Sequence, residues 1–354
     1  MHEIERTNKM KKQKQLICLI FALLITICFC LPVFAGDYNL KEIELYPGGM
    51  PFGAKIISDG LTVVKFSDTQ GKNASSAYLA GIREGDIITK INNINVNSIE
   101  DFVALVNKSR NNEIKFTVKR NQQELNFNVT PRYSAEDGKY KTGIWVKDST
   151  SGIGTITFIN PKTNEFGGLG HAICDSATGK LVPLIHGDVM DVSINGVIKG
   201  QVGTAGELKG TFQNKKIGTL TKNSTCGVFG TLSLNTIHSP ENLMKICPKE
   251  ELHEGNAYIW CTLDEGSPQK YSIEISNIDT TNSTTKNFKI KIVDENLLKQ
   301  SGGIVQGMSG SPIIQNGKLV GAVTHVLIND PTTGYGIFIE NMLNAANIPM
   351  AKAS

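Results

Sequence analysis

Short apolar runs that alternate with polar residues constrain the fold of this chain more than any other feature. From about residue 135 to the C-terminus, the apolar stretches are short and strand-like, as in TGIWV, GIGTITFI, FKIKIV and KLVGAVTHVLI. Only ENLMKI and the tail ENMLNAANI follow a helical pattern there. Alternation with a period of two is typical of β-strands that have one buried face, and 35 glycines allow tight turns between them. The sequence therefore predicts a mainly β fold, with a β-barrel or a pair of barrels in residues 135–354.

The N-terminus has the pattern of an export signal. Five Lys or Arg residues precede an apolar run from Leu16 to Leu31, and the sequence Pro-Val-Phe-Ala follows. A helix of that length spans roughly 24 Å, which is short for a hydrocarbon core of about 30 Å. Residues 1–35 are therefore expected to be a signal peptide, with an uncleaved membrane anchor as the alternative. In either case the rest of the chain is expected outside the cytoplasmic membrane, because the basic residues stay inside.

Charge and cysteine content exclude some classes of function. The first 35 residues hold five basic and two acidic side chains, so the remainder carries 31 of each and is neutral. Nucleic acid is not expected as a partner, because binding it needs a concentrated basic face. The four cysteines outside the leader match no zinc pattern, and the sequence does not decide between disulfides and free thiols. These are Cys174, Cys226, Cys247 and Cys261.

A compact unit is predicted from Tyr46 to about Thr130. Its segments are a strand pair in GAKIISDGLTVVKF, one helical turn in SSAYLAG, a strand pair with a turn at Asn92-Asn93, a helix that starts at Ser98, and two final strands. This order and the phrase AGIREGDIITKINNINV resemble a PDZ domain of the kind found in bacterial proteases. The resemblance covers residues 46–130.

The resemblance to PDZ domains implies a peptide-binding site. In such domains an extended peptide C-terminus adds to a sheet edge, and the N–H groups of a loop hold its carboxylate. By position, the expected loop is Gly48-Gly49-Met50-Pro51-Phe52-Gly53, which departs from the usual Gly-Leu-Gly-Phe wording. The alternative reading is a glycine turn that opens a strand.

The segment Gly307-Met308-Ser309-Gly310-Ser311-Pro312 predicts a nucleophile loop. Flanking glycines allow a sharp turn, so that a serine hydroxyl projects while the N–H groups of Gly307 and Ser309 converge as an oxyanion hole. The segment resembles the Gly-Asp-Ser-Gly-Gly-Pro loop of chymotrypsin-like proteases, with Met308 and Ser311 as the departures. The alternative is a Gly/Ser hairpin without catalytic function.

A serine nucleophile needs a neighbouring base, and His171 is the best of six histidines. His171 stands in the glycine-rich turn GGLGHA, and it precedes Ser309 as the histidine precedes the serine in the chymotrypsin template. His325 lies inside an apolar strand, where a buried structural histidine with its hydrogen bonds satisfied is expected. The remaining histidines are in the leader or in polar or turn segments, with His186 a weaker rival: His2, His186, His238 and His253.

The third member of a triad is a carboxylate that fixes the tautomer of the histidine. Asp294 ends the alternating strand FKIKIV and lies shortly before Ser309. The residues alone do not separate Asp294 from its rivals. These are Asp175, Asp188, Asp191 and Asp264.

Together, GLGHAICD, the segment from Asp294 to Pro312 and GAVTHVLINDPTTGYGIFIE, behind a PDZ-like unit and an export signal, resemble the stage IV sporulation protein B family of peptidases from spore-forming Firmicutes. The resemblance implies that His171, Asp294 and Ser309 are catalytic and that the barrel domain is an elaborated chymotrypsin-like double barrel. It further implies limited regulatory proteolysis between mother cell and forespore. There, cleavage of a membrane-bound regulator of an intramembrane protease activates a late sigma factor, and the enzyme also cleaves itself.

Two classes of function remain open from the sequence. The first is a serine endopeptidase that needs no metal or organic cofactor and acts on protein substrates. The second is a non-catalytic scaffold at the membrane, in which the PDZ-like unit recruits partners. The presence of all three catalytic residue types favours the peptidase.

Overall fold

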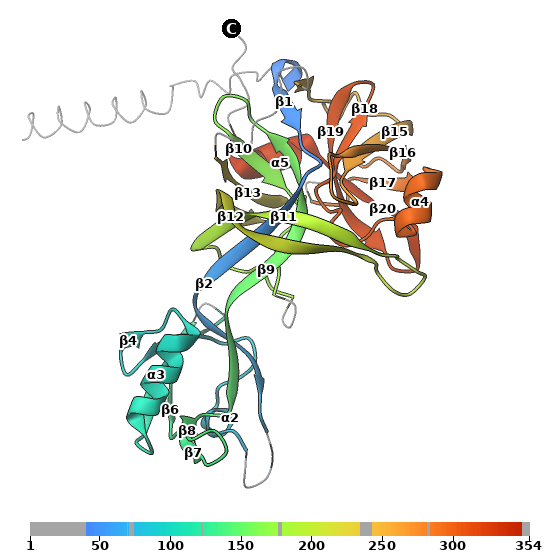
Figure 1. Ribbon diagram of the computed structural model, residues 1–354. Helices are drawn as coiled ribbons and strands as arrows, with labels where there is room; N and C mark the ends of the chain where they lie inside the picture. Colours follow the sequence, from blue (N-terminus) through green and yellow to red (C-terminus); the bar gives the residue numbers. More distant parts are fainter. Residues whose placement is uncertain are drawn as a thin grey trace, which may run out of the picture. The chain divides into compact units, whose positions relative to one another are not determined.

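The computed structural model describes residues 40–348 apart from 69, 71–73, 122, 176–178, 234–242 and 282–283. The described chain is mainly β, as the alternating apolar runs predict (Figure 1). The expected signal or anchor helix of residues 1–35 lies outside the described residues. Within the described part of the chain, no helix is long and apolar enough to cross a membrane.

The C-terminal part forms a closed six-stranded barrel. Branched and aromatic side chains from all its strands fill the core, including Ile259, Ile273, Ile290 and Phe338. Helix α4 (Glu295–Ser301) follows the third strand, and α5 (Ile339–Ala346) follows the last. The barrel order is β15 (Gly255–Cys261), β16 (Gln269–Ser276), β17 (Phe288–Ile292), β20 (Asp330–Phe338), β19 (Lys318–Leu327) and β18 (Pro312–Gln315), which returns to β15.

A second ring of strand pairs is built from earlier segments. Strand β2 (Pro51–Phe66) pairs with both β9 and β11, and these two pairings close a path through six strands. Side chains such as Phe52, Ile56, Phe166 and Val189 form its core. Two short strands, β1 (Glu44–Pro47) and β14 (Met244–Lys245), extend the sheet beyond β9. The other strands of the ring are β9 (Ile144–Ile159), β10 (Glu165–Gly168), β13 (Gly227–Leu232), β12 (Glu207–Ser224) and β11 (His186–Ile198).

A smaller unit, here called the 61–146 unit, has its own core between the second half of β2 and the first residues of β9. The turn predicted at Asn92-Asn93 is confirmed, with φ of 49° and 66° at the two residues. The helix start predicted at Ser98 is also confirmed, because its side chain accepts from Asp101 N at 3.1 Å. The elements are α2 (Ser76–Ala80), β3 (Ile87–Ile91), β4 (Ile94–Asn95), α3 (Ile99–Ser109), β5 (Ile114–Arg120), β6 (Gln123–Val129), β7 (Arg132–Ser134) and β8 (Lys139–Lys141).

The strands pass between the two cores in a way that the sequence did not reveal. Residues 46–57 were assigned to the PDZ-like unit, but Pro51–Ile57 pair with β9 and β11 of the six-stranded ring. The helical pattern read in ENLMKI is wrong for Met244–Lys245, which form strand β14. Helix α4 was not predicted from the sequence. The alternating pattern of FKIKIV indicates only the strand, and Asp294, which caps the helix, was interpreted as a catalytic carboxylate.

The four cysteines outside the leader are free thiols in the structure. Cys226, Cys247 and Cys261 are buried, whereas Cys174 is exposed. Burial raises the pKa of the Cys247 thiol to about 11, and burial raises that of Cys261 as well. These buried thiols are unreactive in the folded chain.

Candidate active site

The nucleophile loop joins the two ring systems. Thr155 Oγ1 donates to Gly307 O and Thr157 Oγ1 donates to Gly310 O, each at 2.7 Å, and Thr155 N donates to Ser309 O at 2.9 Å. All three donors belong to β9, and both threonine side chains are buried. Strand β9 therefore holds these three carbonyl groups of the loop in place.

Both glycines of the loop need the conformation that glycine allows. Gly307 and Gly310 have φ of +95°, a region that L side chains rarely adopt. A Cβ atom on Gly310 would lie 2.0 Å from Thr155 O. Met308, the departure from the chymotrypsin-like wording, is completely buried in the barrel core. The methionine thus anchors the loop by packing, and the turn itself has the shape that the sequence predicts.

Ser309 projects from this turn and is half-buried. Its hydroxyl donates to Thr324 O of β19 at 2.8 Å. Among the described residues, the N–H groups of Gly307 and Ser309 donate to no acceptor. Two unused N–H donors beside a serine hydroxyl are what an oxyanion hole requires.

His171 follows β10 through a strained turn. Leu169 and Gly170 have φ of 65° and 67°, and a Cβ on Gly170 would meet Thr324 Cγ2 at 2.8 Å. His171 Nδ1 lies 2.9 Å from Ala172 O, so the neutral ring can donate from Nδ1 and accept at Nε2. Burial lowers the pKa of His171 below its ordinary value. The structure thus brings the histidine turn against β19, beside the nucleophile loop, and keeps the imidazole neutral.

Asp294 has a different environment from the one that the sequence suggested. It is the N-cap of α4, where its Oδ1 accepts from Asn296 N at 3.0 Å and Leu297 N at 3.1 Å. Its Oδ2 accepts from Ser272 N at 3.1 Å. No hydrogen bond or ion pair joins Asp294 to His171 among the described residues. The structure therefore does not bring this carboxylate together with the histidine.

Among the described residues, no hydrogen bond or ion pair joins a rival aspartate to His171. Asp175 pairs with Lys147 at 2.6 Å, Asp188 with Lys216 at 2.6 Å, and Asp191 with Lys215 at 3.7 Å. The Lys216 hydrogen bond lowers the pKa of Asp188. Asp264 is exposed in a loop that follows β15.

His325 is a functional candidate that sequence reasoning missed. Its ring centroid lies 5.2 Å from that of His171, and it follows Thr324, whose carbonyl binds the serine hydroxyl. The expectation of a fully satisfied histidine is wrong, because His325 Nδ1 is buried without a partner among the described residues. Burial, followed by the charges of His171 and Lys286, lowers the pKa of His325 to about 4. Its position in β19, the second strand after the nucleophile loop, was the available signal.

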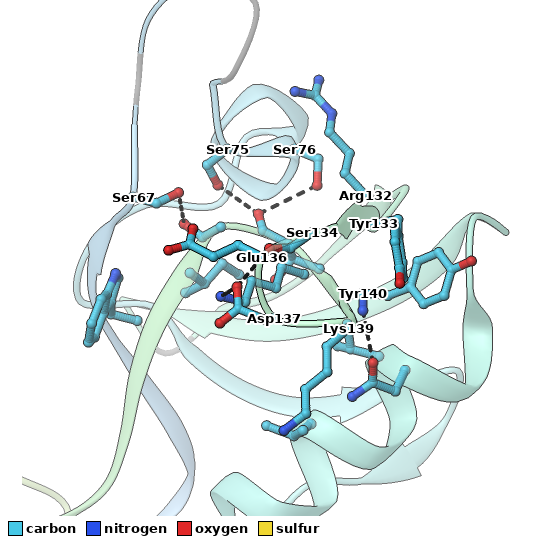
Figure 2. Close-up of a pocket in the computed structure, with 18 of the residues that line it drawn as sticks. Ser67, Ser75, Ser76, Arg132, Tyr133, Ser134, Glu136, Asp137, Lys139 and Tyr140 are labelled. Atoms are coloured by element: carbon cyan, nitrogen blue, oxygen red, sulfur yellow. Dashed lines mark hydrogen bonds and ion pairs between the residues drawn. The ribbon is translucent and has the colours of Figure 1, made fainter.

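The 61–146 unit holds a groove of about 920 Å³ between α3 and the segment Thr142–Trp145 (Figure 2). Ser75 and Ser76 direct their hydroxyls at Thr142 O, at 2.8 and 3.4 Å. Asn107 of α3 accepts from Tyr140 N at 2.9 Å. Val103 and Trp145 line the groove, and Trp145 is 58% exposed. A groove between a helix and a strand, with both apolar and polar side chains in its lining, suits an extended peptide.

The segment Gly48–Gly53, predicted to bind the peptide carboxylate, does not line this groove. Gly48 N donates to Thr157 O at 2.9 Å and Gly49 N donates to Ile156 O at 2.8 Å, so both groups are engaged with β9. Met50 precedes β2, and Pro51, Phe52 and Gly53 begin that strand. The alternative reading of this segment, a glycine turn that opens a strand, describes it correctly.

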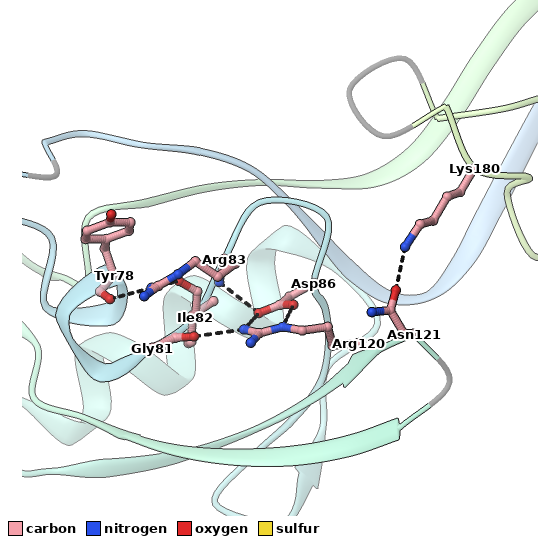
Figure 3. A network of polar contacts seen from close by, with 8 residues as sticks. All are labelled: Tyr78, Gly81, Ile82, Arg83, Asp86, Arg120, Asn121 and Lys180. Carbon is pink, nitrogen blue, oxygen red and sulfur yellow. Dashed lines mark hydrogen bonds and ion pairs between the residues drawn. The ribbon is translucent and has the colours of Figure 1, made fainter.

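A buried ion pair stabilises the 61–146 unit (Figure 3). Arg120 Nε and Nη2 each lie 2.7 Å from a carboxylate oxygen of Asp86, and Nη2 also donates to Gly81 O at 2.8 Å. Arg83 N donates to the same carboxylate at 2.9 Å. The Asp86 side chain is only 1% exposed, and its hydrogen bonds raise the pKa of Arg120. The pair fixes the C-terminal turn of α2 to strand β5.

Comparisons with known proteins agree with this organisation. The family described as SpoIVB peptidase S55 matches residues 138–343, and a PDZ domain family matches residues 68–120. No curated protein matches the chain.

Solved structures are similar to parts of the chain. The PDZ domain of the SdrC-like protein from Listeria monocytogenes is 19% identical, with a TM-score of 0.23, over 26% of this chain and 93% of that domain. The Rv3671c protease from M. tuberculosis, in its active form, is 14% identical, with a TM-score of 0.34, over 58% of this chain and 76% of that protein. The inactive form of the Rv3671c protease is 14% identical, with a TM-score of 0.33, over 55% of this chain and 83% of that one.

Proposed function

The chain belongs to the SpoIVB peptidase S55 family, and from this premise we propose that it is a serine endopeptidase with Ser309 as nucleophile and His171 as base. The observation that carries the proposal is the pair of unused N–H groups at Gly307 and Ser309 beside the serine hydroxyl. A scaffold without catalysis has no need for such a pair. The two six-stranded rings suit a chymotrypsin-like double barrel with the site between them.

The reaction is an acyl transfer. Ser309 Oγ attacks the substrate carbonyl carbon while His171 takes the hydroxyl proton, and the N–H groups of Gly307 and Ser309 stabilise the oxyanion. His171 then gives the proton to the leaving amine, and water releases the acyl group by the same steps. The lowered pKa of His171 keeps the ring neutral at pH 7, which is the form that accepts a proton.

The orienting role of Asp294 stays a prediction from the family resemblance. Its carboxylate caps α4, and α4 leads through Gly302 into the segment before Ser309. We propose that Asp294 supports the nucleophile loop from this position. The side chain thereby contributes to the stability of α4 and of the loop that follows it.

Family membership and the PDZ domain support a role in limited proteolysis of protein substrates. The groove between α3 and Thr142–Trp145 is the proposed site for a peptide segment of the substrate, or of a second copy during self-cleavage. The predicted export signal of residues 1–35 supports action outside the cytoplasmic membrane, in the space around the forespore. A membrane-bound regulator of an intramembrane protease is the proposed physiological substrate.

Labelling with a fluorophosphonate separates the peptidase from a non-catalytic scaffold. The wild-type chain should be labelled at Ser309, as mapped by peptide mass spectrometry, and should hydrolyse p-nitrophenyl acetate. Ser309→Ala should abolish the labelling and lower ester turnover by roughly 10⁴-fold or more, with an unchanged fold by circular dichroism. An unlabelled wild-type chain, or an alanine variant with normal turnover, would overturn the proposal.

A further inference from the structure

A pocket beside the nucleophile loop has no part in the chemistry described so far. It has a volume of about 710 Å³, and Gly307 and Gln306 form one side of it. Strand β9 contributes Ser151–Ile153 to its wall. The remaining lining residues come from the paired strands β11 and β12, which extend toward α4 (Figure 1): Asn195, Glu207, Leu208, Lys209, Gly210 and Phe212.

The pocket adjoins a free edge of strand β9. Thr155 directs both its N–H and its C=O away from β2. The N–H donates to Ser309 O, and the C=O accepts from Leu169 N. The register between β2 and β9 is unbroken from Pro51 to Ile57, so every second residue of β9 has the same orientation. Ile153 therefore also directs its N–H and C=O away from β2, and among the described residues neither group has a hydrogen-bond partner. A strand edge with a free donor and acceptor can pair with an extended peptide.

The geometry at Ser309 indicates which half of a substrate reaches Ile153. Thr324 O lies 2.8 Å from Ser309 Oγ, on the β19 side of the loop. Because Thr324 O lies so close to the atom that attacks the substrate, it can accept a hydrogen bond from the backbone N–H of the substrate residue whose carbonyl is attacked. The acyl half of the substrate then follows β19. The leaving half continues in the other direction, past Gly307 to the edge at Ile153 and the pocket.

The lining of the pocket indicates what side chain it takes. Ile153, Leu208 and Phe212 provide apolar surface, and Phe212 is 36% exposed, with its ring against Gly53. The charged side chains at the rim, Glu207 and Lys209, are exposed and of opposite sign, so they select against neither charge. An exposed aromatic ring in a concave site gains contact area from an apolar side chain.

We propose that this pocket and the Ile153 edge form the leaving-side substrate subsite, which binds a large apolar side chain within the first two residues after the cleaved bond. This inference rests on the proposed peptidase function and adds its substrate preference. The sequence alone does not predict this subsite, because it combines segments from residues 151–153, 195–212 and 306–307.

Acyl transfer to added amines tests the subsite without knowledge of the natural cleavage site. p-Nitrophenyl acetate acylates Ser309, and an added amine competes with water for the acetyl group. The amine nitrogen bonds to the carbonyl carbon, the bond to Ser309 Oγ breaks, and His171 transfers the amine proton to Oγ. Because aminolysis is the reverse of acylation by a peptide, the preferred amine reports the leaving-side subsite.

The amines are the dipeptide amides Phe-Gly-NH₂, Gly-Phe-NH₂ and Gly-Gly-NH₂, with acetylated product measured by mass spectrometry. In the wild-type protein, one of the two phenylalanine amides should be acetylated at least about tenfold more efficiently than Gly-Gly-NH₂. Phe212→Ala should reduce this preference to about two- or threefold. Ser151→Leu should also reduce it, since Ser151 is exposed, lines the pocket on the same face of β9 as Ile153, and would narrow the pocket as leucine.

Two control variants lie outside the pocket. Ile198→Ala removes an exposed apolar side chain from the end of β11. Gly266→Leu adds a leucine in an exposed loop, where a Cβ on residue 266 would lie 3.8 Å from Asp264 Oδ1. Both should keep the wild-type preference. Ester hydrolysis without added amine should be unchanged in all four variants, which also shows that they fold.

The outcomes distinguish this inference from the function on which it depends. Ester turnover that requires Ser309, combined with no amine preference or with a preference that the pocket variants leave intact, overturns the subsite alone. Equal losses of ester hydrolysis and aminolysis in the pocket variants also overturn it, because the pocket would then support the loop rather than bind the leaving half. Ester turnover that survives Ser309→Ala overturns the peptidase proposal and the subsite with it.

Discussion

Replacement of Asp294 by asparagine and by alanine separates a helix cap from an orienting carboxylate. Asparagine keeps an oxygen for Asn296 N and Leu297 N, but its amide cannot accept from Ser272 N. The loss of that one hydrogen bond should lower the free energy of unfolding by about 1 kcal/mol. Alanine removes the cap as well and should cost about 2 kcal/mol.

The structure predicts that ester turnover by Asp294→Asn stays within a few fold of the wild-type rate, since the carboxylate has no contact with His171. The measurements are p-nitrophenyl acetate hydrolysis and urea unfolding followed by fluorescence. Ser98→Ala is the matched control, because it removes the N-cap of α3 and should cost about 1 kcal/mol without changing turnover. A loss of about 10⁴-fold in Asp294→Asn, with stability retained, would refute this reasoning and make Asp294 the orienting residue of a triad.

Three further predictions concern the histidine, the ion pair and the groove. Because burial lowers the pKa of His171, the midpoint of the fall in ester turnover on acidification should lie below pH 6.5; a midpoint at or above 6.5 would indicate a carboxylate partner. Asp86→Ala should lower the free energy of unfolding by about 3 kcal/mol in urea, because it leaves Arg120 unpaired, whereas Glu84→Ala at an exposed position should not; equal losses would contradict the role of the pair. Val103→Glu in the groove should slow cleavage of a membrane-tethered protein substrate and spare ester turnover, with Leu79→Glu as the control on the exposed face of α2; normal processing by the groove variant would exclude the groove.

Local patterns predicted those parts of the molecule that depend on local residues. The strand alternation, the turn at Asn92-Asn93 and the cap at Ser98 each need only a few neighbouring residues, and the structure confirms all three. The shape of the GMSGSP turn follows equally from its glycines.

Most of the contacts that the sequence did not indicate join distant segments, and the role of Asp294 stays a prediction. The Gly48–Gly53 segment has the composition of a binding loop, but the N–H groups of Gly48 and Gly49 donate to β9, about a hundred residues later in the chain. Asp294 ends a strand as expected, but the following residues form a helix that takes up its carboxylate. Thr155 and Thr157 were not considered, although buried threonines at alternate positions of an apolar strand indicate a polar partner on that face. For Gly48–Gly53 and for the two threonines the deciding contact is distant in sequence, so a motif alone could not supply it, whereas the cap at Asp294 is local.

Strand β9 contains both the groove-lining residue Trp145 and the threonines that hold the nucleophile loop. The hydrogen bonds from Thr155 and Thr157 to the loop involve no residue that lines the groove. Ester turnover should therefore be independent of the groove, while a tethered protein gains from being held close to Ser309. Removal of residues 46–130 is a poor test of this division, because it also removes the β2 residues that close the six-stranded ring. Single substitutions at Val103 avoid that loss and leave every contact of the nucleophile loop in place.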